Sequence, residues 1–463
     1  MISILESRIL DRNCEALGIS LDTLIDNAGA ALYDFLSKGY GGKKILIVCG
    51  AGNNGGDGFA CARRFGKKAA VALLFPPEKI KTEAARRHFK ALGREAQLFS
   101  DVSLDKYDVV VDCGLGTGVR SPLDNIYKDY IKKLKKFKGK IVSADVPTGF
   151  GTRDALLPNV TVTFHDRKEG MTEDNCGSII VADIGIPEEA LHIVGPGDML
   201  LYPVPKEDSH KGENGRLLVI GGGPYIGAPA MSALAAMRVG VDVVRIATPK
   251  RSFAAIASMT PNFIMHQLPG DMLQEKDVKD LLELTKKVDA VLIGPGLGTA
   301  DETMAAVREF VLRCKKPMVV DADGITAISV MSVVTENVII TPHRGEFEKF
   351  SGFSLSGCDL MDISKKRNVT ILLKGVTDVI VHNDKKRTNR SGTPAMTVGG
   401  TGDVLSGIVA GLLSKGMDTF NAASLGAFIS GAAGEKAYDE FSYGLLATDV
   451  IDMIPKVLKE HLK

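Results

Sequence analysis

A cluster of small and polar residues follows the apolar run at 44–49 and precedes a stretch typical of a helix. Glycines in such a turn let the backbone bend tightly and present amide N–H groups to an anion at the helix N-terminus. The string is neither GxGxxG nor GxxxxGK(S/T), so the usual dinucleotide and P-loop interpretations do not apply. A plain turn with Asp57 as helix cap is the alternative, but it leaves two asparagines without a role. The cluster comprises Gly52, Asn53, Asn54, Gly55, Gly56, Asp57 and Gly58.

Two further predicted strands end in carboxylates. Asp112 precedes CGLGTG (113–118), and Asp145 precedes VPTG (146–149). Parallel strands bring their carboxyl ends to one edge of a sheet, where open α/β folds bind ligands. An Asp after a strand is often only a cap or turn residue. Three polar strand ends at one edge nevertheless favour a binding site.

A second set of motifs occupies the C-terminal half. Gly400, Thr401, Gly402 and Asp403 open an apolar helix within 397–416. Backbone amides at such a helix start can hold phosphoryl charge, and Asp403 can take a proton from an attacking hydroxyl. The alternative is that Asp403 only caps its own helix. Four strings at other predicted strand ends support a site, namely GPGLG (294–298), DADG (321–324), TPHRGEF (341–347) and LLKG, which ends at Gly375.

These motifs depend on strands that must lie side by side. Short apolar runs alternate with amphipathic stretches from about residue 44 to the end, which is typical of parallel sheets with crossover helices. A length of 463 residues predicts two domains. The segment 195–215 concentrates glycine, proline and charge, as interdomain connections do. We therefore predict an α/β protein with one domain at 1–203 and another at 204–463, divided near Pro203.

Composition excludes several classes of function. A formal net charge of +1 and the absence of tryptophan argue against a nucleic-acid-binding surface. Charges scattered from Glu6 onward do not resemble a secretory signal, and no stretch approaches the roughly 20 apolar residues of a membrane span. Seven dispersed cysteines without a CxxC pair indicate neither a zinc site nor a disulfide framework. We expect a cytoplasmic protein.

Roughly residues 1–195 resemble the NAD(P)H-hydrate epimerases in the order and spacing of four segments. These segments are GNNGGDG (52–58), DCGLGTG (112–118), DVPTG (145–149) and TFHDRKEG (163–170). This resemblance implies a Rossmann-like domain that interconverts the R and S forms of hydrated NADH or NADPH, with Asp145 as the acid/base group. It also implies K⁺ held by Asn54, Asp112 and Thr148. Thr148 stands where the family pattern has Ser, but it keeps the hydroxyl oxygen. The implied substrate contacts are Asn53, Asn54, Gly55, Gly56, Asp57, Gly116, Thr117 and Gly118.

Roughly residues 208–463 resemble the ADP- or ATP-dependent NAD(P)H-hydrate dehydratases, which are ribokinase-like α/β/α proteins. The resemblance implies that a nucleotide phosphorylates the hydroxyl of the hydrate, after which phosphate leaves and the double bond returns. Asp403 would be the base. Mg²⁺ would accompany the nucleotide, with Glu346 ordering its water. The implied ligand contacts are Gly400, Thr401, Gly402, Lys374 and Gly375 for the nucleotide, and Gly227, Ala228, Gly296 and His343 for the hydrate.

Three alternatives stay open at this point. His343 follows a proline and is as compatible with a capped turn as with substrate contact. The C-terminal half also fits a kinase of a small alcohol, because GTGD and LLKG are shared among ribokinase-like enzymes. A nucleotide-binding regulator is the third alternative. Loss of Asp145 or Asp403 would favour it, but both aspartates and their glycine turns are present. We expect NADH hydrate, NADPH hydrate and ADP or ATP as partners, no nucleic acid or membrane, and a homo-oligomer.

Overall fold

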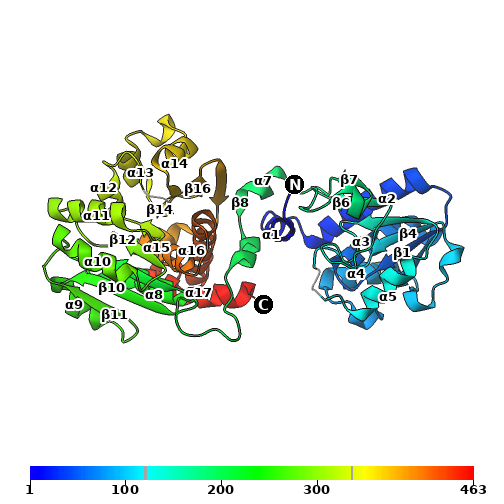
Figure 1. The fold of residues 1–463 in the computed structure, drawn as a ribbon, viewed down its shortest axis with the longest axis horizontal. Coiled ribbons are helices and arrows are strands. Elements are labelled where there is room, and N and C mark those ends of the chain that lie inside the picture. The colour runs from blue at the N-terminus through cyan, green and yellow to red at the C-terminus, as the bar shows by residue number, and fades with distance from the viewer. Residues whose placement is uncertain (119–121, 335–336, 463) are drawn as a thin grey trace. The chain divides into compact units, whose positions relative to one another are not determined.

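The computed structural model describes residues 1–118, 122–334 and 337–462 and divides the chain into an N-terminal unit, 1–190, and a C-terminal unit, 191–463 (Figure 1). The division falls before the expected boundary near Pro203. Strand β8 (Ile193–Val194) pairs with β17 (Lys385–Asn389). Asp198, fully buried on the 3-10 helix Pro196–Leu201, forms an ion pair with Arg387. Residues after the division therefore complete the C-terminal unit, because their strand pairing and ion pair lie there.

The N-terminal unit is built on a parallel sheet of order β3-β2-β1-β4-β5-β6-β7 within the described residues. Strand β1 pairs with β2 on one side and with β4 on the other, so the direction of chain winding reverses between β1 and β4. Ligands of open α/β sheets bind at this reversal point, outside the carboxyl ends of the strands. The strands are β1 (Ile45–Cys49), β2 (Ala69–Leu73), β3 (Gln97–Leu98), β4 (Val109–Cys113), β5 (Lys140–Ala144), β6 (Val160–Phe164) and β7 (Ser178–Ala182).

Helices cover both faces of this sheet. Leu32 of α2 and Phe59 of α3 pack on one face, and Tyr130 and Ile131 of α5 pack on the other. Every residue of β1 is buried, as expected for a central parallel strand with near-continuous apolar sequence. The helices are α1 (Ile4–Ala16), α2 (Leu21–Tyr40), α3 (Asn53–Phe65), α4 (Glu83–Leu92), α5 (Asn125–Leu134), α6 (Glu173–Cys176) and, at the division, α7 (Glu188–His192).

The C-terminal unit has a larger sheet, of order β11-β10-β9-β12-β13-β14-β15-β16-β17-β8 within the described residues. It winds outward in both directions from β9, and only the hairpin β15-β16-β17 is antiparallel among the pairs described. The reversal point lies between β9 and β12. The remaining strands are β9 (Arg216–Ile220), β10 (Val243–Pro249), β11 (Ile264–Leu268), β12 (Ala290–Ile293), β13 (Met318–Val320), β14 (Val338–Ile340), β15 (Thr370–Leu373) and β16 (Asp378–His382).

Two helical layers enclose this sheet. Helices α8, α15, α16 and α17 pack on one face, and α10, α11, α12, α13 and α14 pack on the other. The expected three-layer α/β/α arrangement is confirmed. None of the helices within the described ranges has the length and apolar character needed to cross a bilayer. The helices are α8 (Gly227–Arg238), α9 (Lys250–Ala257), α10 (Val278–Thr285), α11 (Asp301–Arg313), α12 (Asp323–Ile328), α13 (Arg344–Ser351), α14 (Leu360–Arg367), α15 (Thr401–Ser414), α16 (Thr419–Phe441) and α17 (Ala447–His461).

Candidate functional sites

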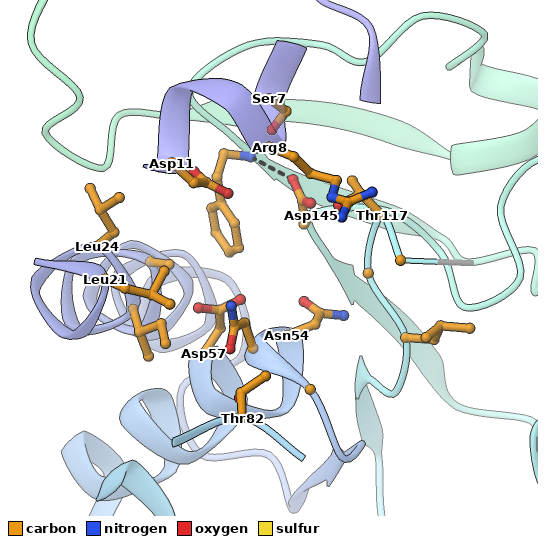
Figure 2. A pocket seen from close by; sticks show the side chains of 18 of the residues that line it. Ser7, Arg8, Asp11, Leu21, Leu24, Asn54, Asp57, Thr82, Thr117 and Asp145 are labelled. Carbon is orange, nitrogen blue, oxygen red and sulfur yellow. Dashed lines mark hydrogen bonds between the residues drawn. The ribbon is translucent and has the colours of Figure 1, made fainter. Parts of the chain in front are cut away.

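A pocket of about 510 Å³ opens at the reversal point of the N-terminal sheet (Figure 2). Its polar wall comes from the turn after β1, the turn after β4 and the residue after β5. Its apolar wall includes Leu21 and Leu24 of α2, and α1 contributes Arg8 and Asp11. The structure therefore gathers most of the predicted epimerase residues in one cavity. Those that line it are Asn53, Asn54, Asp57, Gly116, Thr117, Gly118 and Asp145.

The glycine-rich turn after β1 packs backbone against backbone. A Cβ on Gly55 would lie 2.1 Å from the carbonyl oxygen of Gly50, so only glycine fits there. Helix α3 begins at Asn53, and among the described residues no side chain caps it. Asp57 lies inside this helix, so its interpretation as a helix cap is wrong. The first turn of α3 instead places its backbone N–H groups at the pocket.

The side chain of Asn54 is buried but unpaired. Its exposed fraction is 8%, and no described residue forms a hydrogen bond with its amide oxygen or nitrogen. Buried polar atoms without partners are rare and call for a ligand, an ion or water. Gly116 packs against this side chain, since a Cβ there would lie 3.2 Å from the Asn54 Cβ. The turns after β1 and β4 thus meet at an amide group that lacks a partner.

Asp112 is fully buried and is not among the residues that line the pocket. Its Oδ1 accepts hydrogen bonds from the Thr148 hydroxyl at 2.6 Å and the Tyr130 hydroxyl at 3.0 Å. Its Oδ2 accepts from Ser143 Oγ at 2.8 Å and from Thr148 N at 2.9 Å. The predicted pair Asp112 and Thr148 is therefore in direct contact. Because Asp112 already accepts these bonds, a cation there would replace at least one donor.

Asp145 has a backbone φ of +61°, a left-handed conformation that L-residues seldom adopt. Its Oδ1 lies 2.6 Å from Nζ of Lys168, a side chain with an exposed fraction of 1%. The Lys168 ammonium also donates to Phe164 O at 2.7 Å and to Thr163 Oγ1 at 3.2 Å. This network holds the carboxylate at the pocket edge. Lys168 belongs to the TFHDRKEG segment, but its residue type alone predicts no role in the pocket, because a lone lysine after a strand is normally exposed.

Two more carboxyls face the pocket. Burial, followed by the charge of Asp145, raises the pKa of Asp11 to about 7. Burial also raises the pKa of Asp57 well above its usual range. Figure 2 shows Asp11 on α1 and Asp57 on α3, with Asp145 at the same cavity. Carboxyls with raised pKa values within one pocket are candidates for acid and base roles.

In the C-terminal unit, α15 begins beside α8. Gly400 has φ +100°, and a Cβ there would lie 2.6 Å from Sδ of Met231. Gly227 is the first residue of α8, and a Cβ on it would lie 3.9 Å from Cε of the same methionine. No side chain caps α15 among the described residues, so the interpretation of Asp403 as a cap is wrong. The helix start thus remains available to an anion.

A charge cluster surrounds Asp403. Nζ of Lys374 lies 3.3 Å from Asp321 Oδ1 and 4.0 Å from Glu346 Oε2. Burial, together with the charge of Asp321, raises the pKa of Asp403 to about 7, although Lys374 opposes the shift. A Cβ on Gly402 would lie 3.3 Å from the same ammonium. The motifs DADG, TPHRGEF, LLKG and GTGD therefore meet in one place.

His343 serves as the N-cap of α13. Its Nδ1 accepts the backbone N–H of Gly345 at 3.0 Å, which agrees with the capped-turn alternative for that nitrogen. The ring remains 62% exposed. Lys374 N donates to Pro342 O at 2.9 Å, so this turn lies directly beside the LLKG turn. Capping by Nδ1 leaves the exposed ring open to a ligand.

Three other predicted residues have mainly backbone contacts. Gly296 packs on Tyr225, since a Cβ there would lie 2.2 Å from the Tyr225 carbonyl oxygen. Ala228 accepts a hydrogen bond from Ser232 within α8. Gly375 N donates to Asp378 Oδ1 at 3.1 Å. Within the described parts of the chain, no group of three or more His, Cys, Asp or Glu residues is arranged to hold a metal ion.

Comparison with known proteins decides between the alternatives for the function of the chain. Residues 217–456 match the family described as NAD(P)H-hydrate dehydratase, and residues 21–170 match the YjeF-related protein N-terminus. A bifunctional NAD(P)H-hydrate repair enzyme from Archaeoglobus fulgidus is 39% identical over 99% of this chain and 98% of its own. The chain belongs to the family of bifunctional NAD(P)H-hydrate repair enzymes. One from Methanothermobacter thermautotrophicus is 38% identical over 97% of this chain and 93% of its own.

Solved structures resemble the C-terminal unit. The ADP/ATP-dependent NAD(P)H-hydrate dehydratase of Bacillus subtilis, crystallised with ATP and Mg²⁺, matches with a TM-score of 0.51 and 28% identity, over 58% of this chain and 99% of its own. A Streptococcus mutans protein of hypothetical function, SMU.573, matches with a TM-score of 0.53 and 26% identity, over 58% and 100%. The expected ribokinase-like fold is confirmed. So is the expected pairing of an epimerase domain with a dehydratase domain in one repair enzyme.

Proposed function

We propose that the pocket of the N-terminal unit interconverts the R and S hydrates of NADH and NADPH, with Asp145 transferring the proton. The observation that carries this proposal is the Asp145–Lys168 ion pair of 2.6 Å at the pocket edge. The buried ammonium fixes the position of the carboxylate and balances its charge. The turns at 53–57 and 116–118 then bind the polar parts of the substrate through backbone N–H groups.

The proposed epimerase site includes K⁺, held by oxygens of Asn54, Asp112 and Thr148. The unpaired amide oxygen of Asn54 supports this assignment, because a hard cation prefers amide, carboxylate and hydroxyl oxygens. When bound, the ion supplies positive charge that orients substrate oxygens. We expect replacement of K⁺ by a bulky organic cation to lower epimerisation while leaving dehydration of the S hydrate unchanged. Equal activity in both salts would contradict the assignment.

For the C-terminal unit we propose dehydration that depends on ADP or ATP with Mg²⁺, supported by the ligands of the Bacillus subtilis relative. Asp403 takes the proton of the substrate hydroxyl, and the hydroxyl oxygen attacks the terminal phosphorus of the nucleotide. The bond from that phosphorus to the bridging oxygen breaks, and the shortened nucleotide leaves with its electrons. Gly400, Thr401 and Gly402 supply N–H groups, and Lys374 neutralises phosphate charge. The phosphate then leaves with the C–O bonding electrons, and a proton lost from the neighbouring ring carbon restores the double bond. Glu346 would order water around Mg²⁺.

The remaining assignments complete this proposal. Gly375 would contact the nucleotide, and Gly227, Ala228, Gly296 and His343 would contact the hydrate. We place the reaction in the cytoplasm, which the burial of six of the seven free thiols supports, since such cysteines suit a reducing compartment. We also propose a homo-oligomer. Size-exclusion chromatography with light scattering tests that state directly.

One experiment tests both activities. Purified protein is added to mixed R and S NADH hydrate with K⁺, Mg²⁺ and either ADP or ATP, and recovery of reduced nicotinamide absorbance is followed. Complete conversion supports both activities and identifies the phosphoryl donor. Conversion that stops when the S form is consumed contradicts the epimerase proposal. No conversion with either nucleotide would favour a kinase of a small alcohol.

A further inference from the structure

Helix α1 brings a carboxyl into the epimerase pocket that no sequence motif marked. Asp11 lines the cavity together with Arg8 of the same helix. Leu10 and Cys14, on another side of the helix, are buried in the core of the unit. Ile2, just before the helix, forms a parallel bridge with Lys168, and its N–H donates to Arg167 O at 2.9 Å. The start of the chain is thus anchored to the segment that holds Asp145.

Asp11 and Asp145 differ in their charge environment. Asp145 pairs with the buried ammonium of Lys168 at 2.6 Å. Burial is the largest cause that raises the pKa of Asp11 to about 7, followed by the charge of Asp145, while Lys168 and Arg8 lower it. Asp57 is different again, because burial, more than the charges of Asp145 and Asp11, raises the pKa of that carboxyl well above its usual range. Asp11 is therefore the carboxyl that gains and loses a proton near neutral pH.

Two further observations indicate that this space can bind a ligand. Asn54, 8% exposed, has an amide without a described hydrogen-bond partner, and it lines the same cavity as Asp11 (Figure 2). Leu21, Leu24 and Ile25 of α2 provide an apolar wall for a ring. A polar ligand with a flat apolar part would satisfy both surfaces, as in most small-molecule sites.

We propose that Asp11 is a second proton-transferring group, which works with Asp145 to invert the hydrated carbon. This inference rests on the proposed epimerase activity. In a hydrated dihydronicotinamide the hydroxyl-bearing carbon is bonded to the ring nitrogen. Asp11 donates its proton to the hydroxyl, the C–O bonding pair leaves with water, and the nitrogen lone pair forms a C=N⁺ bond. Water then adds to the other face, Asp145 takes its proton, and the C=N⁺ pair returns to nitrogen.

This cycle conserves atoms and charge. One proton moves from Asp11 to Asp145 in one direction of epimerisation, and it moves back in the other direction. Before a second conversion in the same direction, exchange with pocket water removes the proton from Asp145 and returns one to Asp11. No oxidant, reductant or nucleotide is needed. The active form of the pocket carries one proton between the two carboxyls, so the rate falls when the pH rises above the pKa of Asp11, about 7.

Several other charged or titratable groups face Asp11 and belong to its pH response. Arg8 and Cys14 lie on the same helix, and Asp57 belongs to α3. Asp145 follows β5, and Lys168 follows β6. An amide in place of Asp11 removes only the proton exchange, because Asn has nearly the same shape. The pH profile therefore separates proton transfer from a structural role.

The test compares Asp11→Asn with Glu15→Gln, the same type of change at an exposed residue of α1 outside the pocket. Without nucleotide, the separated hydrates are followed as they interconvert over pH 5–9. We expect Asp11→Asn to lower kcat at least about 100-fold, with little change in KM, and to lose the decline in rate above pH 7. Glu15→Gln should keep both the rate and the profile. Hydrogen exchange in β1, β4 and β5 checks that the N-terminal unit of each variant is intact.

Water labelled with heavy oxygen adds a second measurement. The proposed step incorporates one solvent oxygen into each inverted hydrate, at the rate of epimerisation and above the rate without enzyme. Wild-type rates in the Asp11→Asn variant, or inversion without label, would overturn the inference while leaving the epimerase assignment intact. Absence of epimerisation by the wild-type chain would instead overturn the proposed function itself.

Discussion

Replacement of Lys168 by methionine is the most direct test of how the epimerase pocket is built. Methionine fills a similar volume but removes the ammonium, which lies 2.6 Å from Asp145 and donates to Phe164 O at 2.7 Å. Removal of one partner of a buried ion pair typically costs 3–5 kcal/mol. The Asp145 side chain is 15% exposed, so pocket water can solvate part of its charge. We therefore expect the free energy of unfolding of the N-terminal unit to fall by about 3 kcal/mol.

Hydrogen exchange resolved by peptide is the appropriate assay, because it reports the stability of each unit separately. Protection in β5 and β6 should fall in Lys168→Met, while protection in the C-terminal unit stays unchanged. Epimerisation should fall at least about 100-fold, since the carboxylate loses its position. Lys140→Met, at an exposed site on β5, is the matched control. A stability loss below about 1 kcal/mol, with epimerisation within threefold of wild type, would refute the reasoning.

Three further predictions concern the other groups. Asp403→Asn should lower nucleotide-dependent dehydration at least about 100-fold and leave epimerisation unchanged, and normal dehydration would reject Asp403 as the base. The pKa of Asp403 is raised to about 7, so the folded unit binds this proton more tightly than the unfolded chain does. The free energy of unfolding should therefore fall as the pH rises from about 4 to about 7. Denaturation curves of Asp403→Asn should lack that part of the decline. Gly55→Ala should destabilise the N-terminal unit by at least about 2 kcal/mol and abolish epimerisation, because its Cβ would lie 2.1 Å from Gly50 O. Gly39→Ala, on α2 with open space around it, should not destabilise the unit, and a similar loss there would show that the Gly55 result is not specific to the turn.

Much of the fold followed from local patterns. Apolar runs identified most of the strands, and polar residues at their ends identified the edge where the pockets form. Local patterns do not show that the segment after Ala190 joins the C-terminal unit, because it does so through pairing of β8 with β17, nearly two hundred residues away along the chain. Glycine and proline content marks where a chain turns but not which core it joins.

Sequence by itself determined the alternation of strands and helices and the positions of the glycine turns. It also placed Asp145 after a strand and Asp403 at the start of a helix. Each of these features depends only on neighbouring residues. Tertiary structure alone decided which charges meet. Lys168 is buried against Asp145, and Asp11 reaches the same pocket from α1, although nothing in their local sequence requires it. A carboxyl changes its protonation through burial and through charges brought close by folding, and both are properties of the packed molecule.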